Sequence, residues 1–158
     1  MPETLLFTDG SVSIQSGIGY GAYLKILDPK LSLEEHRKTI RTKRFESTSS
    51  TKLELQTLLW ALSEVAEEID KVIIHTDSQN IISLLKRRNR LEKHKFRSKK
   101  GTLLNHHELY QQFFQQIDDI DCCFVKMKGH LRSKEKDSTD HLFSLVDIAS
   151  RNALRNKI

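Results

Sequence analysis

Three acidic residues stand where a carboxylate is unfavourable unless something compensates its charge. Asp9 ends the apolar run LLFTD, Asp77 ends the apolar run KVIIHTD, and Glu54 lies at the start of a helical apolar pattern. Carboxylates that are brought together raise one another's pKa unless cations lie among them. Magnesium binds hard oxygen ligands and also accepts phosphate oxygens, so these acids indicate metal-assisted phosphoryl-transfer chemistry.

Each acid also has an ordinary structural explanation. Thr51 and Glu54 have the spacing of a capping box at the start of a helix. Asp77, followed by Ser78, could help to cap the next helix, and Asp9 before a glycine could be a turn aspartate. These explanations suffice one by one, but together they leave the apolar approaches to both aspartates unexplained.

The elements that would position these acids alternate between strands and helices. Apolar and β-forming residues predict strands over residues 5–9, 17–27, 71–77 and 122–128, with a weaker edge strand over 37–46. Turn-forming residues predict a loop over residues 11–17. Apolar spacings of three and four predict a helix from near residues 47–51 to 69, and further helices over 78–88, 105–117 and 142–154. This order predicts an α/β fold in which helices flank one sheet, and ligands of such sheets bind outside the carboxyl ends of the strands.

Length and cysteine content bound the organisation of the chain. Its 158 residues suit one domain over residues 1–158, without a repeat or a linker. Cys122 and Cys123 are adjacent and poorly placed to bridge, which favours a reducing, cytoplasmic location. The N-terminal residues lack the pattern of a secretory leader, and no run of eighteen apolar residues occurs, so we expect a soluble protein with no membrane partner.

The charge of the chain is uneven. The formal net charge is +5 and the sequence pI is about 9.2, which suits a polyanionic partner. Residues 86–100, KRRNRLEKHKFRSKK, contain nine lysines and arginines against the single acid Glu92. Such blocks are usually solvated faces and otherwise mark contact with nucleic acid, so their neighbours in the fold must decide.

Four motifs, taken in order, resemble those of the type 1 ribonucleases H. They are FTDGS (7–11), TKLEL (51–55), TDSQ (76–79) and VKMKGH (125–130), and the resemblance spans essentially the whole chain. It implies a ribonuclease H-like fold of the α/β class, a mixed five-stranded sheet with helices on both faces. It also implies a monomer that hydrolyses the RNA strand of RNA/DNA hybrids to 5′-phosphate products, using two Mg²⁺ ions for which Mn²⁺ can substitute.

The resemblance also assigns roles in the chemistry. It carries metal ligation onto Asp9, Glu54 and Asp77, and it gives His130 a supporting role in water activation or product release. The family's closing aspartate usually lies about ten residues after this histidine, which selects Asp140. The stretch VDIASRNAL (146–154) better resembles the family's final helix and selects Asp147. We favour Asp147, because loop insertions are tolerated more readily than loss of helix packing, and Asp140 is then a loop or helix-start charge.

The positions expected to contact substrate depart from the family in part. The family often has two asparagines just before its helix glutamate, where this chain has Ser50 and Thr51, and hydroxyls offer fewer hydrogen-bonding groups than amides. The first loop lacks the usual proline and glycine pattern, whereas Gln79 matches the family's glutamine. The basic stretch corresponds to a protrusion that grips the DNA strand in many members, with Phe96 available to pack or stack. The predicted substrate-binding residues are Gln15, Ser49, Ser50, Thr51, Gln79, Arg88, Lys95 and Arg97.

Other readings of the acids remain open. Proofreading-type exonucleases place a second acid two residues after the first, where this chain has Ser11. Integrase-like enzymes use a glutamate last, whereas Glu54 here lies between the aspartates. From another class, the chain could be a noncatalytic nucleic-acid-binding module that retains a ribonuclease H-like fold. Its altered substrate residues favour that alternative, and its complete set of acids favours the metal-dependent endoribonuclease.

Overall fold

A single mixed sheet organises the protein. The computed structural model describes residues 3–28, 30–128 and 131–157. The strands, in the order β3-β2-β1-β4-β5, are β1 (Glu3–Ser13), β2 (Ile18–Ile26), β3 (Arg41–Phe45), β4 (Lys71–Thr76) and β5 (Asp121–Lys126). The β1–β2 and β2–β3 pairs are antiparallel, and the β1–β4 and β4–β5 pairs are parallel. The predicted mixed five-stranded sheet is therefore confirmed.

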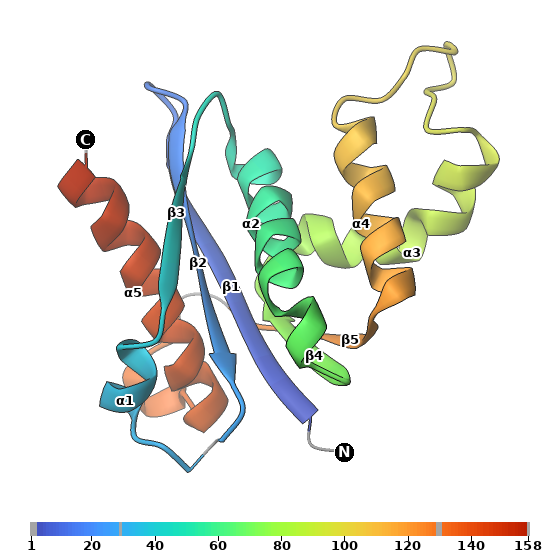
Figure 1. The fold of residues 1–158 in the computed structure, drawn as a ribbon. Coiled ribbons are helices and arrows are strands. Elements are labelled where there is room, and N and C mark those ends of the chain that lie inside the picture. The colour runs from blue at the N-terminus through green and yellow to red at the C-terminus, as the bar shows by residue number, and fades with distance from the viewer. Residues whose placement is uncertain (1–2, 29, 129–130, 158) are drawn as a thin grey trace.

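Helices cover both faces of this sheet. Figure 1 shows α2, α3 and α4 on one side and α5 with α1 on the other. The helices are α1 (Leu33–Arg37), α2 (Ser50–Val65), α3 (Gln79–Lys93), α4 (His107–Asp119) and α5 (Ser138–Lys157). Two short 3-10 segments, Ala66–Glu68 and Ser133–Glu135, follow α2 and precede α5. Among the described residues, none of the helices combines the length and the apolar character needed to cross a membrane.

Each face of the sheet buries its own apolar core. On the α2 side, Leu58, Leu62 and Ile74 are fully buried, and Trp60 packs against this cluster. On the α5 side, Phe7 and Val146 are buried in a second cluster. Successive side chains of β1 point to opposite faces of the sheet, so this strand contributes residues to both cores. The active-site candidates Asp9 and Asp147 belong to the elements that form the second core.

Two parts of the fold differ from the sequence prediction. Residues 11–13 were predicted as loop, but β1 continues to Ser13, whose pairing partner in β2 is Ile18. The prediction was wrong because strand pairing supplies hydrogen bonds that the local turn-forming residues do not reveal. Helix α1 was missed, although Ser32 and Glu35 form a capping box at its start and had the required spacing.

Glycines in the β1–β2 hairpin allow α2 to lie close against the sheet. A Cβ atom added at Gly21 would stand 2.2 Å from Thr57 Oγ1, and one added at Gly19 would stand 2.8 Å from Leu53 Cδ2. Gly10, next to Asp9, has the same relation to Leu53, at 2.9 Å from its Cδ2. This close approach sets where the first turns of α2, and so Glu54, lie over the hairpin.

We expect Gly21→Ala to destabilise the protein, because the new methyl group overlaps the buried Thr57 side chain. Overpacking of this kind lowers the free energy of unfolding by about 1 to 3 kcal/mol. Urea denaturation followed by circular dichroism measures the change. Thr57→Ala introduced into the same protein removes the two nearest side-chain atoms and should restore part of the loss. Equal stability of Gly21→Ala and wild type would contradict the proposed role of this glycine.

Candidate active site

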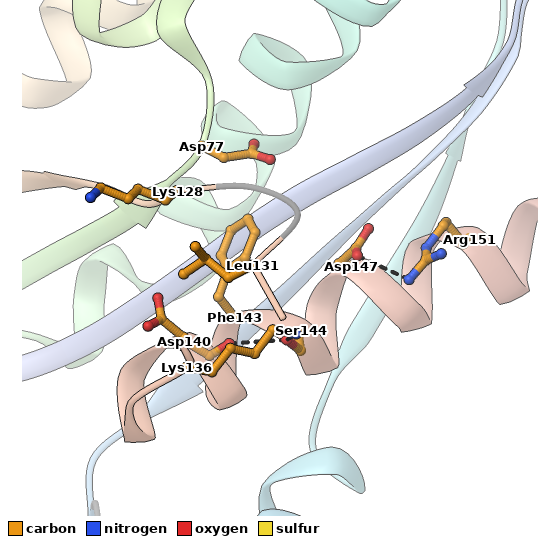
Figure 2. Close-up of a pocket in the computed structure, with 9 residues that line it drawn as sticks. All are labelled: Asp77, Lys128, Leu131, Lys136, Asp140, Phe143, Ser144, Asp147 and Arg151. Carbon is orange, nitrogen blue, oxygen red and sulfur yellow. Dashed lines mark hydrogen bonds and ion pairs between the residues drawn. The ribbon is translucent and has the colours of Figure 1, made fainter. Parts of the chain in front are cut away.

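Four acids from separate parts of the fold act on one another: the charges of Asp77 and Asp147 act on Asp9, and that of Asp77 acts on Glu54. Asp9 lies in β1, Glu54 in α2, Asp77 directly after β4, and Asp147 in α5. Asp77 and Asp147 line one pocket of about 280 Å³, and Figure 2 shows them on facing sides of it. Cations also line this pocket, among them Lys128 on the segment after β5. The pocket therefore contains both acidic and basic groups, and it lies beyond the carboxyl end of β4.

Asp9 is the acid whose environment departs furthest from water. Burial, the charge of Asp77 and both the charge and a hydrogen-bonding contact of Asp147 raise the pKa of Asp9 to about 8, although the Gly10 N–H opposes the shift. A carboxyl group with this pKa holds a proton at neutral pH when no cation compensates the neighbouring acids. Asp9 is thus the acid on which burial and the charges of Asp77 and Asp147 act together.

Glu54 reaches the same group of acids through Ser78. The Ser78 hydroxyl donates to Glu54 Oε2 at 2.6 Å and also accepts from the backbone N–H of Ile81 at 3.1 Å, so it caps α3. Burial raises the pKa of Glu54, the Ser78 hydrogen bond lowers it, and the charge of Asp77 raises it. One serine therefore starts a helix and orients a carboxylate of another helix.

The two candidates for the fourth acid have different surroundings. Asp147 acts on the pKa of Asp9, and its Oδ2 accepts from Arg151 Nη2 at 3.0 Å. Asp140 exchanges hydrogen bonds with Asp137 at the start of α5: Asp137 N donates to Asp140 Oδ2 at 3.0 Å, and Asp140 N donates to Asp137 Oδ1 at 2.8 Å. Asp140 lines the same pocket as Asp147 but serves the helix cap.

The structure decides between the ordinary explanations of the other acids. Ser49 is the N-cap of α2 and accepts from Lys52 N, so the predicted Thr51–Glu54 capping box does not form. Asp9 lies inside a strand, paired with Ala22, and is not a turn residue. Ser78 rather than Asp77 provides the side-chain cap of α3. Capping and turn formation therefore do not account for the positions of these carboxylates.

The donor set suits a hard divalent cation, although its side chains are turned to partners within the protein. Within the described ranges, no group of three or more His, Cys, Asp or Glu side chains is arranged to hold a metal ion as it stands. Glu54 is engaged by Ser78 and Asp147 by Arg151, which draws two of the four carboxylates toward protein donors. All four groups offer oxygen, the ligand atom that magnesium prefers, and two further acids lie close enough to raise the pKa of the buried Asp9. These residues fit magnesium if the carboxylates turn toward one another on binding.

Most predicted substrate-binding residues are exposed near the acids or on the basic protrusion. Ser49, Ser50 and Thr51 form the exposed start of α2, while Gln15 lies at the tip of the β1–β2 hairpin and Gln79 begins α3. The predicted site residue His130 lies outside the described residues.

The basic stretch of residues 86–100 includes the end of α3 and a folded turn. Phe96 is buried there against Phe114, with ring centroids 6.2 Å apart, so it packs in the core and is not free to stack on a substrate. Lys95 is exposed, and Arg97 donates to the Gly101 carbonyl at 2.8 Å. The turn therefore presents the exposed, positively charged side chains of Lys95 and Arg97.

Arg88, also predicted to contact substrate, is engaged inside the protein. Its guanidinium donates to both carboxylate oxygens of Asp118, at 2.7 and 2.6 Å, and to Glu92 at 2.6 Å. It also lies over the Phe114 ring, 4.9 Å from the centroid. Contact between Arg88 and a phosphate would therefore have to compete with the carboxylates of Asp118 and Glu92.

Sequence reasoning missed two residues of this region. Ser78 holds Glu54, and its signal was only that of a helix cap. Lys136 lines the pocket and donates to Ser144 Oγ at 2.7 Å, as Figure 2 shows. No local pattern marked Lys136, because it lies in the charged segment that precedes α5.

Comparisons with known proteins agree with this fold. A family model described as RNase H matches residues 1–146. Among solved structures, the chain is similar to one of the foamy viral protease-reverse transcriptase in complex with dsDNA, with a TM-score of 0.68, 16% sequence identity and 94% of each chain covered. At this identity the likeness supports the fold alone. No curated protein matches the chain.

Proposed function

The chain belongs to the ribonuclease H family, and from this premise we propose that it is a metal-dependent endoribonuclease that hydrolyses the RNA strand of RNA/DNA hybrids. Members of the family generally use divalent metal ions. The observation that carries the proposal is the raised pKa of Asp9, which burial causes together with the charges of Asp77 and Asp147. A protein that needed only the fold would gain nothing from acids that repel one another.

We propose that Asp9, Glu54, Asp77 and Asp147 hold two Mg²⁺ ions, for which Mn²⁺ can substitute. When bound, these ions would activate water and stabilise the departing oxygen of the phosphodiester. Asp9 has to give up its proton to act as a ligand, and a neighbouring cation favours that loss. Glu54 has to turn from the Ser78 hydroxyl, and Asp147 from the Arg151 guanidinium. His130 keeps its proposed supporting role.

Substrate recognition is proposed to use two surfaces. The hydroxyls of Ser49, Ser50 and Thr51 at the start of α2 can contact the 2′-OH groups of the RNA strand, which distinguish RNA from DNA. Gln15 and Gln79 are proposed to contact the hybrid nearby. Lys95 and Arg97 on the basic protrusion are proposed to bind phosphates of the DNA strand, with an affinity that falls as salt rises.

A cleavage assay tests this function. Purified protein should cut an end-labelled RNA/DNA hybrid within the RNA strand in Mg²⁺ or Mn²⁺, leave 5′ phosphates, and stop when EDTA removes the ions. Duplex DNA should remain intact, and duplex RNA of the same sequence shows whether the enzyme requires a DNA strand. Hybrid binding without cleavage in either metal at low salt would instead favour the noncatalytic binding module.

A further inference from the structure

A hydrogen bond between two serines lies next to the contact between Asp9 and Asp147. Ser11 Oγ and Ser150 Oγ are 2.9 Å apart. Ser11 follows Asp9 by two residues in β1, so both side chains leave the same face of the strand. Ser150 follows Asp147 by three residues in α5, so these two side chains share a face of the helix. The acid pair and the serine pair are therefore successive contacts between the same strand and the same helix.

The direction of the hydrogen bonds follows from the chemistry of Ser150. Its hydroxyl donates to the Asp147 carbonyl oxygen at 3.0 Å. A hydroxyl has a single proton but can accept as well, so Ser150 is left to accept the proton of Ser11. Ser150 is 0% exposed, which makes its polar contacts stronger than they would be in water. Ser150 thus joins β1 to the backbone of the residue that carries the fourth acid.

The apolar core under α5 is formed mainly by residues that precede Asp147. Phe143 and Val146 are buried in the α5-side core, but both precede Asp147 in the helix. Over residues 147–156, for which the structure describes the side chains, Ser150 is the only buried residue. Beyond Asp147 the helix is otherwise half-buried or exposed. Ala149 packs against the same core from a partly buried position, and Ser150 supplies the buried polar contact on that side.

The position of this attachment matters because Asp9 and Asp147 meet across the same contact between β1 and α5. A small displacement of α5 along β1 would change the separation of their carboxyl groups. The hydrogen bond between Ser11 and Ser150 opposes such a displacement. The two serines can therefore keep the carboxyl groups of Asp9 and Asp147 at a fixed separation.

We propose that Ser11 and Ser150 are positioning residues that set the separation of Asp9 and Asp147 and so tune the affinity of the acid site for a divalent cation. The inference rests on the proposed function, in which these acids hold the cation. Neither serine touches the substrate in this proposal. Their effect passes through the register of α5 on β1.

Metal binding to the whole chain tests the proposal without any nucleic acid. Isothermal titration with Mn²⁺ should give a dissociation constant that rises about five- to tenfold in Ser150→Ala and in Ser11→Ala. The double variant should be no weaker than either single variant, because one hydrogen bond is lost in all three. Ser11→Thr keeps a hydroxyl at this strand position and should bind Mn²⁺ with wild-type affinity.

Ser63→Ala is the matched control. Ser63 Oγ makes the same kind of helical bond, to the Trp60 carbonyl at 2.6 Å, but lies on an exposed position of α2. This variant should bind Mn²⁺ as wild type does. Ser11→Ala, whose side chain is only half-buried, keeps the test open if Ser150→Ala fails to fold.

Two further readouts separate positioning from general stability and from the proposed activity. In cleavage assays the Mg²⁺ concentration for half-maximal rate should rise in the serine variants, while the KM for the hybrid stays within twofold of wild type. If the wild-type chain cuts no hybrid, the proposed function fails, and the Mn²⁺ affinities still judge the serine pair. Mn²⁺ affinities within twofold of wild type in both single variants, or additive losses in the double variant, would overturn the positioning role.

Discussion

Asp9→Asn should abolish hybrid cleavage and at the same time make the metal-free protein more stable at neutral pH. We expect the rate to fall by more than about a thousandfold, because an amide cannot supply the negative charge that the proposed metal ligand needs. The stability gain arises because burial, together with the charges of Asp77 and Asp147, raises the pKa of Asp9 to about 8. A loss of activity together with a gain in stability is the pattern expected where an active site contains destabilising charges.

The pH dependence of this gain follows from the raised pKa. Below about pH 4, Asp9 is protonated in both the folded and the unfolded chain, so it does not change the free energy of unfolding. Between 3.8, the ordinary pKa of an aspartate, and about 8, the unfolded chain releases a proton that the folded protein retains, and wild-type stability therefore falls as pH rises. Asparagine has no such titration, so the advantage of Asp9→Asn should grow across this window and level off above it.

Denaturant unfolding at pH 4, 6 and 8 measures this effect. At neutral pH the expected gain is on the order of 2 to 4 kcal/mol. Added Mg²⁺ should raise the melting temperature of wild type but not that of Asp9→Asn. Asp121→Asn, an exposed aspartate at the start of β5, is the matched control and should change neither activity nor stability. A stability difference that is constant from pH 4 to 8 would show that Asp9 does not titrate as described.

Asp147→Asn and Asp140→Asn should have opposite consequences, although both acids lie on α5 and line the same pocket. We expect Asp147→Asn to reduce cleavage by about a hundredfold or more, because it removes a proposed ligand next to Asp9. Asp140→Asn should retain most of the activity, since asparagine can still accept the hydrogen bond from Asp137 N. Its loss of charge at the helix N-terminus should lower stability by only about 0.5 kcal/mol.

Single-turnover cleavage with each variant at several Mg²⁺ concentrations measures the difference. Chemical denaturation of the same preparations shows that both variants are folded. If Asp140→Asn loses activity while Asp147→Asn keeps it, the fourth ligand is Asp140, and the hydrogen bonds between Asp137 and Asp140 must open for metal binding.

Much of the fold was predictable because the patterns that specify it are local. The apolar runs before Asp9 and Asp77 identified β1 and β4, and the spacing of leucines identified α2. Strand and helix periodicities are properties of a few neighbouring residues, so they can be read without knowing the partners. The extension of β1 to Ser13 was not predictable in this way, because it depends on pairing with β2.

The choice between the two candidates for the fourth acid could not be made from local sequence patterns. Asp140 and Asp147 are seven residues apart on one helix, which places them on nearly the same face about 10 Å apart. Helical periodicity therefore cannot distinguish them. The distinction depends on where α5 crosses β1, and this crossing sets Asp147 against Asp9 and leaves Asp140 at the helix cap.

The order of residues was enough to specify the acids, their oxygen chemistry and the ends of the elements that carry them, because composition and periodicity are local. Folding alone determined which acids meet, that Ser78 holds Glu54, and that Ser11 meets Ser150 across 139 positions of the chain. Such contacts depend on how helices pack against a sheet. Packing is a collective result of both cores, so no short stretch of sequence contains it.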